Sequence, residues 1–247
     1  MNALTKLAVT EAKLFTRDLS SVVLPLAMPV LLLLAWGSVG DMRVPAPELG
    51  GQRPLDAIIA PIAIAVALGS LGLTTLPVYL ASYREKGILR RLSVTPAHPL
   101  LLLVAQLLVH LATAALAVVL ALGVGAVVWD VALPRQLPVF AGVVLLGAAA
   151  LFAVGLLIAA VAPRASAATT IGTLAFFPMA ALGGAFVPRD MLPDVVAGIG
   201  DITPLGAALQ AVGDVWAGAR LDLANLAVLA AHLVVAGALA ARWFRWE

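Results

Sequence analysis

The sequence has few charged residues and no cysteine, and each shortage excludes a class of protein. Only 11% of its 247 residues are charged and 63% are hydrophobic, whereas a soluble domain has about 25% charged residues. We therefore expect an integral membrane protein. The lack of cysteine excludes disulfides, thiolate catalysis and zinc–thiolate sites. Basic residues exceed acidic ones by only two and lie in short flanks, so no nucleic-acid-binding surface is expected.

The motifs of several enzyme classes are also missing. No G-x-x-x-x-G-K-[ST] phosphate loop occurs, so the chain is not expected to hydrolyse ATP by that chemistry. H-E-x-x-H is absent, and Ser70 is flanked as LGSLG rather than G-x-S-x-G, which disfavours membrane metalloproteases and serine proteases. We expect no catalytic residue, no metal ligand and no cofactor on this chain.

Six long apolar runs predict six transmembrane helices, because about 20 apolar residues cross the hydrocarbon core and continuous runs without alternation indicate helices. The expected ranges are residues 19–39, 56–81, 100–129, 137–162, 165–187 and 221–243, all within one transmembrane domain, residues 19–247. With the N-terminus in the cytoplasm, ten of the fifteen Lys and Arg residues fall on the inner side. This bias predicts a multi-pass protein of the cell membrane with both termini cytoplasmic.

At the depth of the hydrocarbon core these runs contain essentially no Asp, Glu, Lys or Arg, and His110 and His232 are the only ionisable groups expected there. Proton- and ion-coupled carriers usually place carboxylates near the middle of the membrane. Their absence favours a transporter that receives its energy from outside the bilayer. An ion-coupled secondary transporter or channel remains the alternative, and a lone membrane histidine is more often a hydrogen-bonding residue than a proton relay.

Residues 1–18 predict an amphipathic helix that lies in the inner membrane interface. At 100° per residue, Lys6, Lys13 and Arg17 share one arc, which would face the lipid phosphates. Glu11 interrupts the apolar arc, so we expect it to pair with a basic group on a neighbouring element. The alternative is a positively charged flank that only sets the topology.

The cytoplasmic loop at residues 82–98 carries a second amphipathic feature. Its central residues are Arg84, Glu85, Lys86, Gly87, Ile88, Leu89, Arg90, Arg91 and Leu92. Three apolar side chains on a short exposed helix suit a groove on another protein, whereas a loop that only sets topology does not need them. The alternative is an ordinary positive-inside loop.

The outer segment at residues 188–213 is apolar but broken by prolines and glycines. This pattern predicts two short half-helices that dip back into the outer leaflet, where irregular backbone must be buried in protein or line a cavity. The alternative is an apolar surface loop. Acidic residues in the segment could favour the passage of cationic substrates; they are Asp190, Asp194, Asp201 and Asp214.

Two stretches resemble the membrane permeases of ABC type-2 transporters, the six-span subunits of exporters such as the daunorubicin-resistance type. One is REKGILRRLSVTPAHPLLLLVAQL, at residues 84–107, and the other is LGGAFVPRDMLPDVVAGIGDITPLGAALQAV, at residues 182–212. In the second stretch the matching positions are Gly183, Gly184, Phe186, Pro188, Met191, Leu192, Pro193, Pro204 and Leu205. The family often has an aromatic residue shortly after the last Pro-Leu, where this chain has Gly206, Ala207 and Ala208. The resemblance covers nearly the whole chain.

The resemblance implies an all-α membrane subunit with an N-terminal elbow helix and re-entrant outer half-helices that cap the exit. In this family two permease subunits, either two copies or two paralogues, pair face to face. Two separate ATPase subunits bind ATP and magnesium and dock on the charged loop, which acts as a coupling helix. The implied function is export of a hydrophobic or amphipathic substrate, such as a drug, natural product or lipid-like molecule, across a prokaryotic cytoplasmic membrane.

The same family architecture places the second and fifth spans along the central pathway. The candidate lining residues are Thr74, Thr75, Thr169, Thr170, Thr173, Phe176, Phe177 and Met179. Phe and Met pack adaptably around large amphipathic ligands. The alternative for each of these residues is packing between helices, where Thr also hydrogen-bonds its own backbone.

Overall fold

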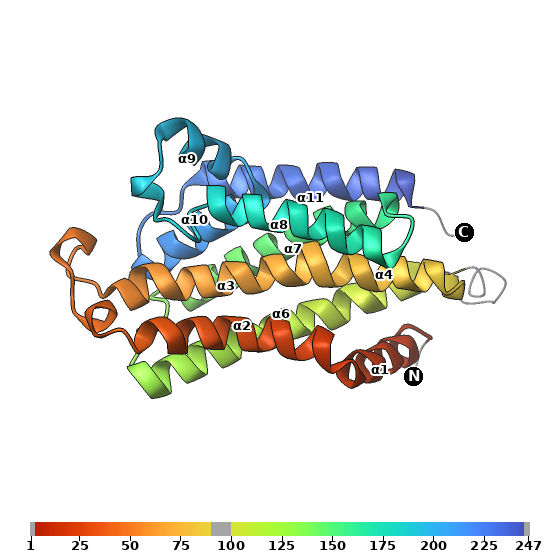
Figure 1. The fold of residues 1–247 in the computed structure, drawn as a ribbon, viewed down its shortest axis with the longest axis horizontal. Helices are drawn as coiled ribbons and strands as arrows, with labels where there is room; N and C mark the ends of the chain where they lie inside the picture. Colours follow the sequence, from red (N-terminus) through yellow and green to blue (C-terminus); the bar gives the residue numbers. More distant parts are fainter. Residues whose placement is uncertain (1–2, 90–99, 245–247) are drawn as a thin grey trace.

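The computed structural model describes residues 3–89 and 100–244, and all regular structure in them is helical (Figure 1). The elements are α1 (Ala3–Arg17), α2 (Leu19–Gly37), η1 (Gly40–Arg43), η2 (Pro47–Leu49), η3 (Leu55–Ile59), α3 (Ala60–Gly69), η4 (Ser70–Thr75), α4 (Leu76–Glu85), α6 (Leu100–Trp129), α7 (Leu137–Val161), α8 (Ala165–Leu182), η5 (Arg189–Met191), α9 (Asp194–Asp201), α10 (Pro204–Ala217) and α11 (Leu223–Trp243). The prediction of an all-helical, polytopic membrane protein is confirmed.

Successive long helices run in alternate directions along the bundle, so the described parts of both chain ends lie at the same end of the molecule (Figure 1). We call this the terminal end and the other the opposite end. Five helices of the described chain are long and apolar enough to cross a membrane, and two bent pairs raise the number to as many as seven. The pairs are α1 with α2, bent by 65°, and α9 with α10, bent by 92°.

One continuous helix, residues 55–85, forms the centre of the bundle. It comprises η3, α3, η4 and α4, and 72% of its most apolar 18-residue stretch is buried inside the bundle. The helices α7 and α8 pack against its second half, α2 and α6 against its first, and α10 against α3. Ile64, Leu68 and Leu71 supply fully enclosed apolar side chains, each at most 1% exposed.

The middle of this central helix departs from α-helical geometry. Residues Ser70–Thr75 form a π-type turn, in which the backbone N–H of Leu76 donates to the carbonyl of Leu71, five residues back. The next residue, Pro77, has no N–H to donate. The turn therefore presents carbonyl oxygens sideways, and π-type turns inside helices often occur at functional positions.

Two glycines on neighbouring helices fit against these carbonyls. A Cβ atom on Gly155 of α7 would lie 2.0 Å from the oxygen of Gly72, and one on Gly172 of α8 would lie 2.1 Å from the oxygen of Leu73. Backbone therefore meets backbone at both contacts, which is the close approach that small residues allow between membrane helices. Both α7 and α8 are fixed to the same turn of the central helix.

The outer helices are much less buried than the central one. In α8 and in α11, only 22% of the most apolar 18-residue stretch of each helix is buried. Apolar side chains such as Leu174, Phe177 and Val234 are more than half exposed. Faces of this kind contact lipid or another membrane subunit.

The helix α8 ends at Leu182, five residues before the predicted end at residue 187. The chain turns immediately afterwards through Gly183 and Gly184, and Gly184 has a φ of +95°, which favours glycine. The apolar residues that follow, including Phe186 and Val187, belong to an exposed connection rather than to the helix.

Candidate functional site

The beginning of the predicted coupling loop is fastened to the turn between α7 and α8. The guanidinium Nη1 of Arg84 donates to the carbonyl oxygens of Ala159 and Ala162, both at 2.8 Å. These carbonyls belong to the last turn and the C-cap of α7, where a cation is also favoured by the helix dipole. The same guanidinium lies 5.2 Å from the ring centre of Phe244, next to the end of α11.

The carboxylate of Glu85, the next residue, bonds to the start of α8, after the turn that follows α7. Glu85 accepts a hydrogen bond from the backbone N–H of Ala165 at 3.1 Å, which supplies a partner for the first turn of α8. Two adjacent side chains therefore hold the end of α7 and the start of α8. A displacement of Arg84 and Glu85 would therefore disturb contacts with both helices.

The loop turns at Lys86 and Gly87 after α4 ends. Gly87 has a φ of +67° and its N–H donates to the carbonyl of Arg84 at 2.9 Å. Leu89 is fully buried in a cluster with Tyr83 and Leu102, whereas Ile88 is half-buried beside them. Leu89 thus ties the loop to its own chain, and the predicted docking residues Arg90, Arg91 and Leu92 lie outside the described residues.

The N-terminal helix α1 has the exposed basic residues that the sequence predicts. Lys6, Lys13 and Arg17 are all exposed, and Phe15 is 2% exposed on the other side. α1 packs against α6 and more lightly against α2. The proposed role of this helix as an interfacial element stays a prediction.

The partner expected for Glu11 was a basic group, and this expectation is wrong. Glu11 is 5% exposed, and its Oε2 accepts hydrogen bonds from the hydroxyl of Tyr83 at 2.7 Å and from Nε2 of Gln106 at 2.6 Å. The three residues come from α1, α4 and α6, so the carboxylate joins the N-terminal helix to both helices that flank the coupling loop. Burial raises the pKa of the Glu11 carboxyl above its ordinary value of 4.5, and the hydrogen bond from Tyr83 lowers it by less.

The two membrane histidines bond within their own helices. Nδ1 of His110 lies 2.9 Å from the carbonyl of Gln106, and Nδ1 of His232 lies 2.9 Å from that of Val228. Both contacts span one helical turn. His110 is fully buried, and its ring lies 5.1 Å from that of Phe15.

The predicted pathway threonines lie on two helices that touch. Thr74 and Thr75 are in the π-type turn, half-buried, and the hydroxyl of Thr75 donates to the carbonyl of Ser70 at 3.3 Å. Thr169 and Thr170 are exposed on α8 and bond the backbone one turn earlier at 3.1 Å. Gly172 of α8 lies against the Cα atom of Thr74, so the structure brings the two groups together.

The remaining pathway candidates divide between core and surface. Phe176 is 5% exposed and packs against Gly69 of the central helix. Phe177 is 52% exposed and stacks with Phe186, with ring centres 6.4 Å apart. Thr173 and Met179 are half-buried. Contact of any of these residues with substrate stays a prediction.

The segment predicted to be re-entrant is two helices at right angles. Pro188, Met191 and Pro193 belong to the stretch before α9, and Met191 is 76% exposed. Pro204 starts α10, where the hydroxyl of Thr203 accepts from the N–H of Gly206 at 3.1 Å. α10 is largely buried against α7, α11 and α3, so the segment is more than a surface loop.

The absence of an aromatic residue after Pro204 and Leu205 has a steric reason. A Cβ atom on Gly206 would lie 2.2 Å from the carbonyl oxygen of Gly200, and one on Gly183 would lie 2.8 Å from the Cα atom of Gly206. Ala207 and Ala208 are fully buried against α7 and α11. No room exists there for a ring.

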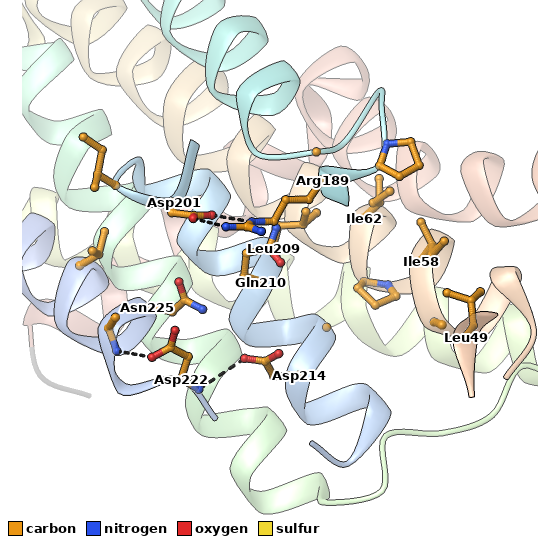
Figure 2. Close-up of a pocket in the computed structure, with 18 residues that line it drawn as sticks. Leu49, Ile58, Ile62, Arg189, Asp201, Leu209, Gln210, Asp214, Asp222 and Asn225 are labelled. Atoms are coloured by element: carbon orange, nitrogen blue, oxygen red, sulfur yellow. Dashed lines mark hydrogen bonds and ion pairs between the residues drawn. The ribbon is translucent and has the colours of Figure 1, made fainter. Parts of the chain in front are cut away.

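A cavity of about 600 Å³ opens beside this segment at the opposite end (Figure 2). Gly184 and Pro188 are the predicted outer residues that line it, together with side chains of α3, α10 and α11. Arg189 and Asp201 form an ion pair across its rim, with Nε 2.9 Å from Oδ1. Among the described residues, no group of three or more His, Asp or Glu side chains could hold a metal ion.

The sequence did not predict two hydrogen-bonded clusters in which polar side chains connect separate helices. One is the Glu11 cluster at the terminal end. The other joins Arg53 and Asp56, which bond each other and also reach the carbonyl of Trp129, at 3.2 Å, and the N–H of Ala132, at 3.0 Å. The available signals were Glu11, which interrupts the apolar arc of residues 1–18, and Asp56, at the start of an apolar run.

Comparison with known proteins identifies a family and a relative. The model of the family described as ABC-2 type transporter matches residues 3–215. The chain is also 24% identical, over 237 residues, to the Bacillus subtilis (strain 168) protein named "Putative transport permease YvfS". That match covers 95% of this chain and 94% of the relative.

Proposed function

Because this chain belongs to the ABC-2 type transporter family, we propose that it is the permease subunit of an ATP-driven exporter. It moves a hydrophobic or amphipathic substrate, such as a drug, natural product or lipid-like molecule, out of the cytoplasm or inner leaflet. A separate ATPase subunit binds ATP and magnesium and docks on residues 84–92. The permease chain performs no hydrolysis itself, since its sequence has no phosphate loop.

The observation that carries this proposal is the attachment of the coupling loop to the transport helices. Arg84 holds the end of α7 and Glu85 holds the start of α8. A force applied to the loop therefore acts directly on two helices that are also fixed to the π-type turn of the central helix. An ordinary topogenic loop does not require these contacts.

The Glu11 cluster supports the same mechanism from the other side of the loop. Tyr83 directly precedes Arg84 in α4, and Gln106 lies in the first turns of α6. Their common acceptor on α1 makes the two flanks of the loop and the N-terminal helix move as one unit. We propose that this unit transmits ATPase closure to the membrane helices.

The exposed face of α8 is the proposed pairing and pathway surface. It carries Thr170, Leu174 and Phe177, all exposed, next to the half-buried threonines of the π-type turn. In the proposed dimer, a second copy or a paralogue would cover this face and close the pathway. In this arrangement the terminal end faces the cytoplasm, as the excess of Lys and Arg there predicts. The membrane that we propose is a prokaryotic cytoplasmic membrane.

The first experiment is affinity purification of the chain from its native membrane in mild detergent, with mass spectrometry of the co-purifying proteins. We expect a stoichiometric soluble subunit that contains a phosphate-loop motif. A pure chain without such a subunit, reproduced under cross-linking, would overturn the proposal and favour the ion-coupled carrier or channel.

A pair of variants tests the docking surface. Ile88→Asp places a charge on the half-buried loop residue and should abolish ATPase co-purification. Met191→Asp makes the same kind of change at a residue that is 76% exposed at the opposite end, and should leave co-purification intact. Equal binding by the two variants would remove the proposed docking role of the loop.

A further inference from the structure

The cavity at the opposite end lies between the loop after α8 and three helices. Ile58 and Ile62 of the central helix line it from one side, α10 contributes Gln210 and Asp214, and Asn225 comes from the first turn of α11 (Figure 2). Its volume of about 600 Å³ falls within the range of roughly 300–1,000 Å³ typical of small-molecule sites.

Two of the carboxylates that line this cavity lack a cationic partner. Arg189 and Asp201 neutralise each other. Asp214 and Asp222 form no salt bridge with any described residue, and their hydrogen bonds come from backbone N–H groups. The bond from the N–H of Asp222 to the carboxylate of Asp214 is 3.4 Å long. The cavity therefore carries two carboxylates without a cationic partner, of which Asp222 also caps the N-terminus of α11, where a negative charge is favoured.

Asn225 gives the second and independent indication of a ligand. It is only 8% exposed, its side chain points into the cavity, and its carboxamide makes no hydrogen bond to the part of the chain that the structure describes (Figure 2). The carboxamide is not sealed in the protein interior but borders the open cavity, where water or a ligand can bond to it. A ligand with N–H groups would supply a donor for its carbonyl oxygen.

The rest of the lining is apolar. Ile58, Pro61, Ile62, Leu209 and Val228 provide a hydrophobic surface beside the acidic side chains. A small inorganic cation would leave this surface unused. An anion would meet two carboxylates without a cationic partner and an arginine that is already paired.

We propose that the cavity binds an amphipathic molecule with a primary ammonium group. The ammonium lies between Asp214 and Asp222 and donates to the carbonyl oxygen of Asn225, and the apolar body packs on Ile58 and Ile62. Two sources have this chemistry, a soluble amine and the headgroup of an aminophospholipid. The proposal goes beyond the exporter function, because binding requires no ATPase.

The test uses the purified full chain in phosphatidylcholine nanodiscs and the fluorescent primary amine dansylcadaverine. We expect a saturable change in fluorescence on titration. N-acetyl-dansylcadaverine has the same apolar body without the charge, and should bind at least about tenfold more weakly. Equal binding of the two probes would overturn the proposal.

Three matched variants locate the site. Asp214→Asn and Asp222→Asn should each weaken dansylcadaverine binding about tenfold. Asp41→Asn removes an exposed carboxylate at the same end of the molecule but outside the cavity, and should leave binding unchanged. Asp222 is itself exposed, so its variant tests the proposal even if the Asp214 variant does not fold. Wild-type affinity in the Asp222 variant would overturn the proposal.

The lipid composition distinguishes the two sources. If the aminophospholipid headgroup occupies the cavity, replacing half of the phosphatidylcholine with phosphatidylethanolamine should weaken dansylcadaverine binding to the wild type and to the Asp41 variant equally. If the natural ligand is a soluble amine, the affinity should be the same in both nanodiscs. Either result identifies the ligand source, and loss of discrimination among the variants in both nanodiscs would contradict the site.

Discussion

The surroundings of the predicted coupling loop at the terminal end and the cavity at the opposite end use charged side chains in opposite ways. At the terminal end, Arg84, Glu85 and Glu11 all make hydrogen bonds to other elements of the same chain. At the opposite end, Asp214 and Asp222 face a cavity with only backbone partners. In our proposals the first region transmits displacement, and the second holds carboxylates without a cationic partner that can take a ligand.

The difference follows from what each end connects. At the terminal end, side chains that cap or bridge helix ends connect α1, α4, α6, α7 and α8. Their hydrogen bonds form networks, so the loss of one bond weakens the others. The opposite end is built from turns and short helices around glycine contacts, and the ion pair beside its cavity is partly exposed. The contacts around the predicted coupling loop are therefore expected to be more sensitive to loss of a charged side chain than the ion pair beside the cavity is.

The largest expected effect comes from the backbone contact between α7 and the π-type turn of the central helix. Gly155→Ala places a methyl group 2.0 Å from the carbonyl oxygen of Gly72. We expect the free energy of unfolding to fall by about 3 kcal/mol, because backbone must move to make room. The measurement is reversible unfolding in mixed micelles containing dodecyl sulfate.

The same substitution elsewhere on α7 provides the control. A Cβ atom on Gly142 would meet no heavy atom within 4 Å. Gly142→Ala should therefore leave stability unchanged or raise it by up to about 1 kcal/mol through helix propensity. If the two alanine variants are equally stable, the backbone contact at Gly72 does not hold the bundle together.

Hydropathy predicted most of the long helical segments, because membrane crossing imposes a simple requirement on composition. The central helix was expected at residues 56–81 and spans 55–85, since polar residues at its end continue the helix while lying outside the apolar run. Helix α8 was expected to end at residue 187, because the apolar composition continues beyond the turn at Gly183 and Gly184.

The side-chain partners could not be read from the sequence in the same way. Tyr83 and Gln106 lie 72 and 95 residues along the chain from Glu11, the carboxylate to which both donate. Their contact depends on how α1 crosses α6, which no local pattern encodes. The roles expected for Arg84 and Leu89 in docking were inferred from an exposed loop, whereas the structure uses both within the chain.

A smaller effect is expected from a direct comparison of one arginine at each end. Arg84→Ala removes two hydrogen bonds to carbonyls at the end of α7, and hydrogen bonds of charged groups contribute roughly 1.5–3 kcal/mol. Arg189→Ala removes an ion pair whose side chains are 42% and 33% exposed, which should cost less than about 1 kcal/mol. Unfolding in the same mixed micelles measures both.

Replacing Arg84 with lysine sharpens this result. Both bonds come from one nitrogen, Nη1, so a lysine ammonium could also make them, but it loses the planar guanidinium that lies over the Phe244 ring. Arg84→Lys should therefore recover only part of the lost stability. Equal losses in Arg84→Ala and Arg189→Ala would contradict the contrast between the ends.

The smallest effect concerns pH and the Glu11 carboxyl. Because burial raises its pKa in the folded state, the unfolded chain releases this proton first as the pH rises from about 4.5. The folded state binds more protons than the unfolded state in that interval, so stability falls with rising pH until the folded pKa is passed. Glu11→Gln keeps an acceptor for Tyr83 and removes the titration, so its melting temperature should fall less between pH 4.5 and neutrality.

An exposed acid at the other end separates this local effect from the general charge of the molecule. Glu48 lies in η2, is exposed and contacts neither the cavity nor the Glu11 cluster. Glu48→Gln should follow the wild-type pH dependence of the melting temperature, while Glu11→Gln departs from it. Parallel curves for the wild type and the Glu11 variant would mean that burial imposes no desolvation penalty on this carboxylate, and the terminal end would then differ from the opposite end in geometry alone.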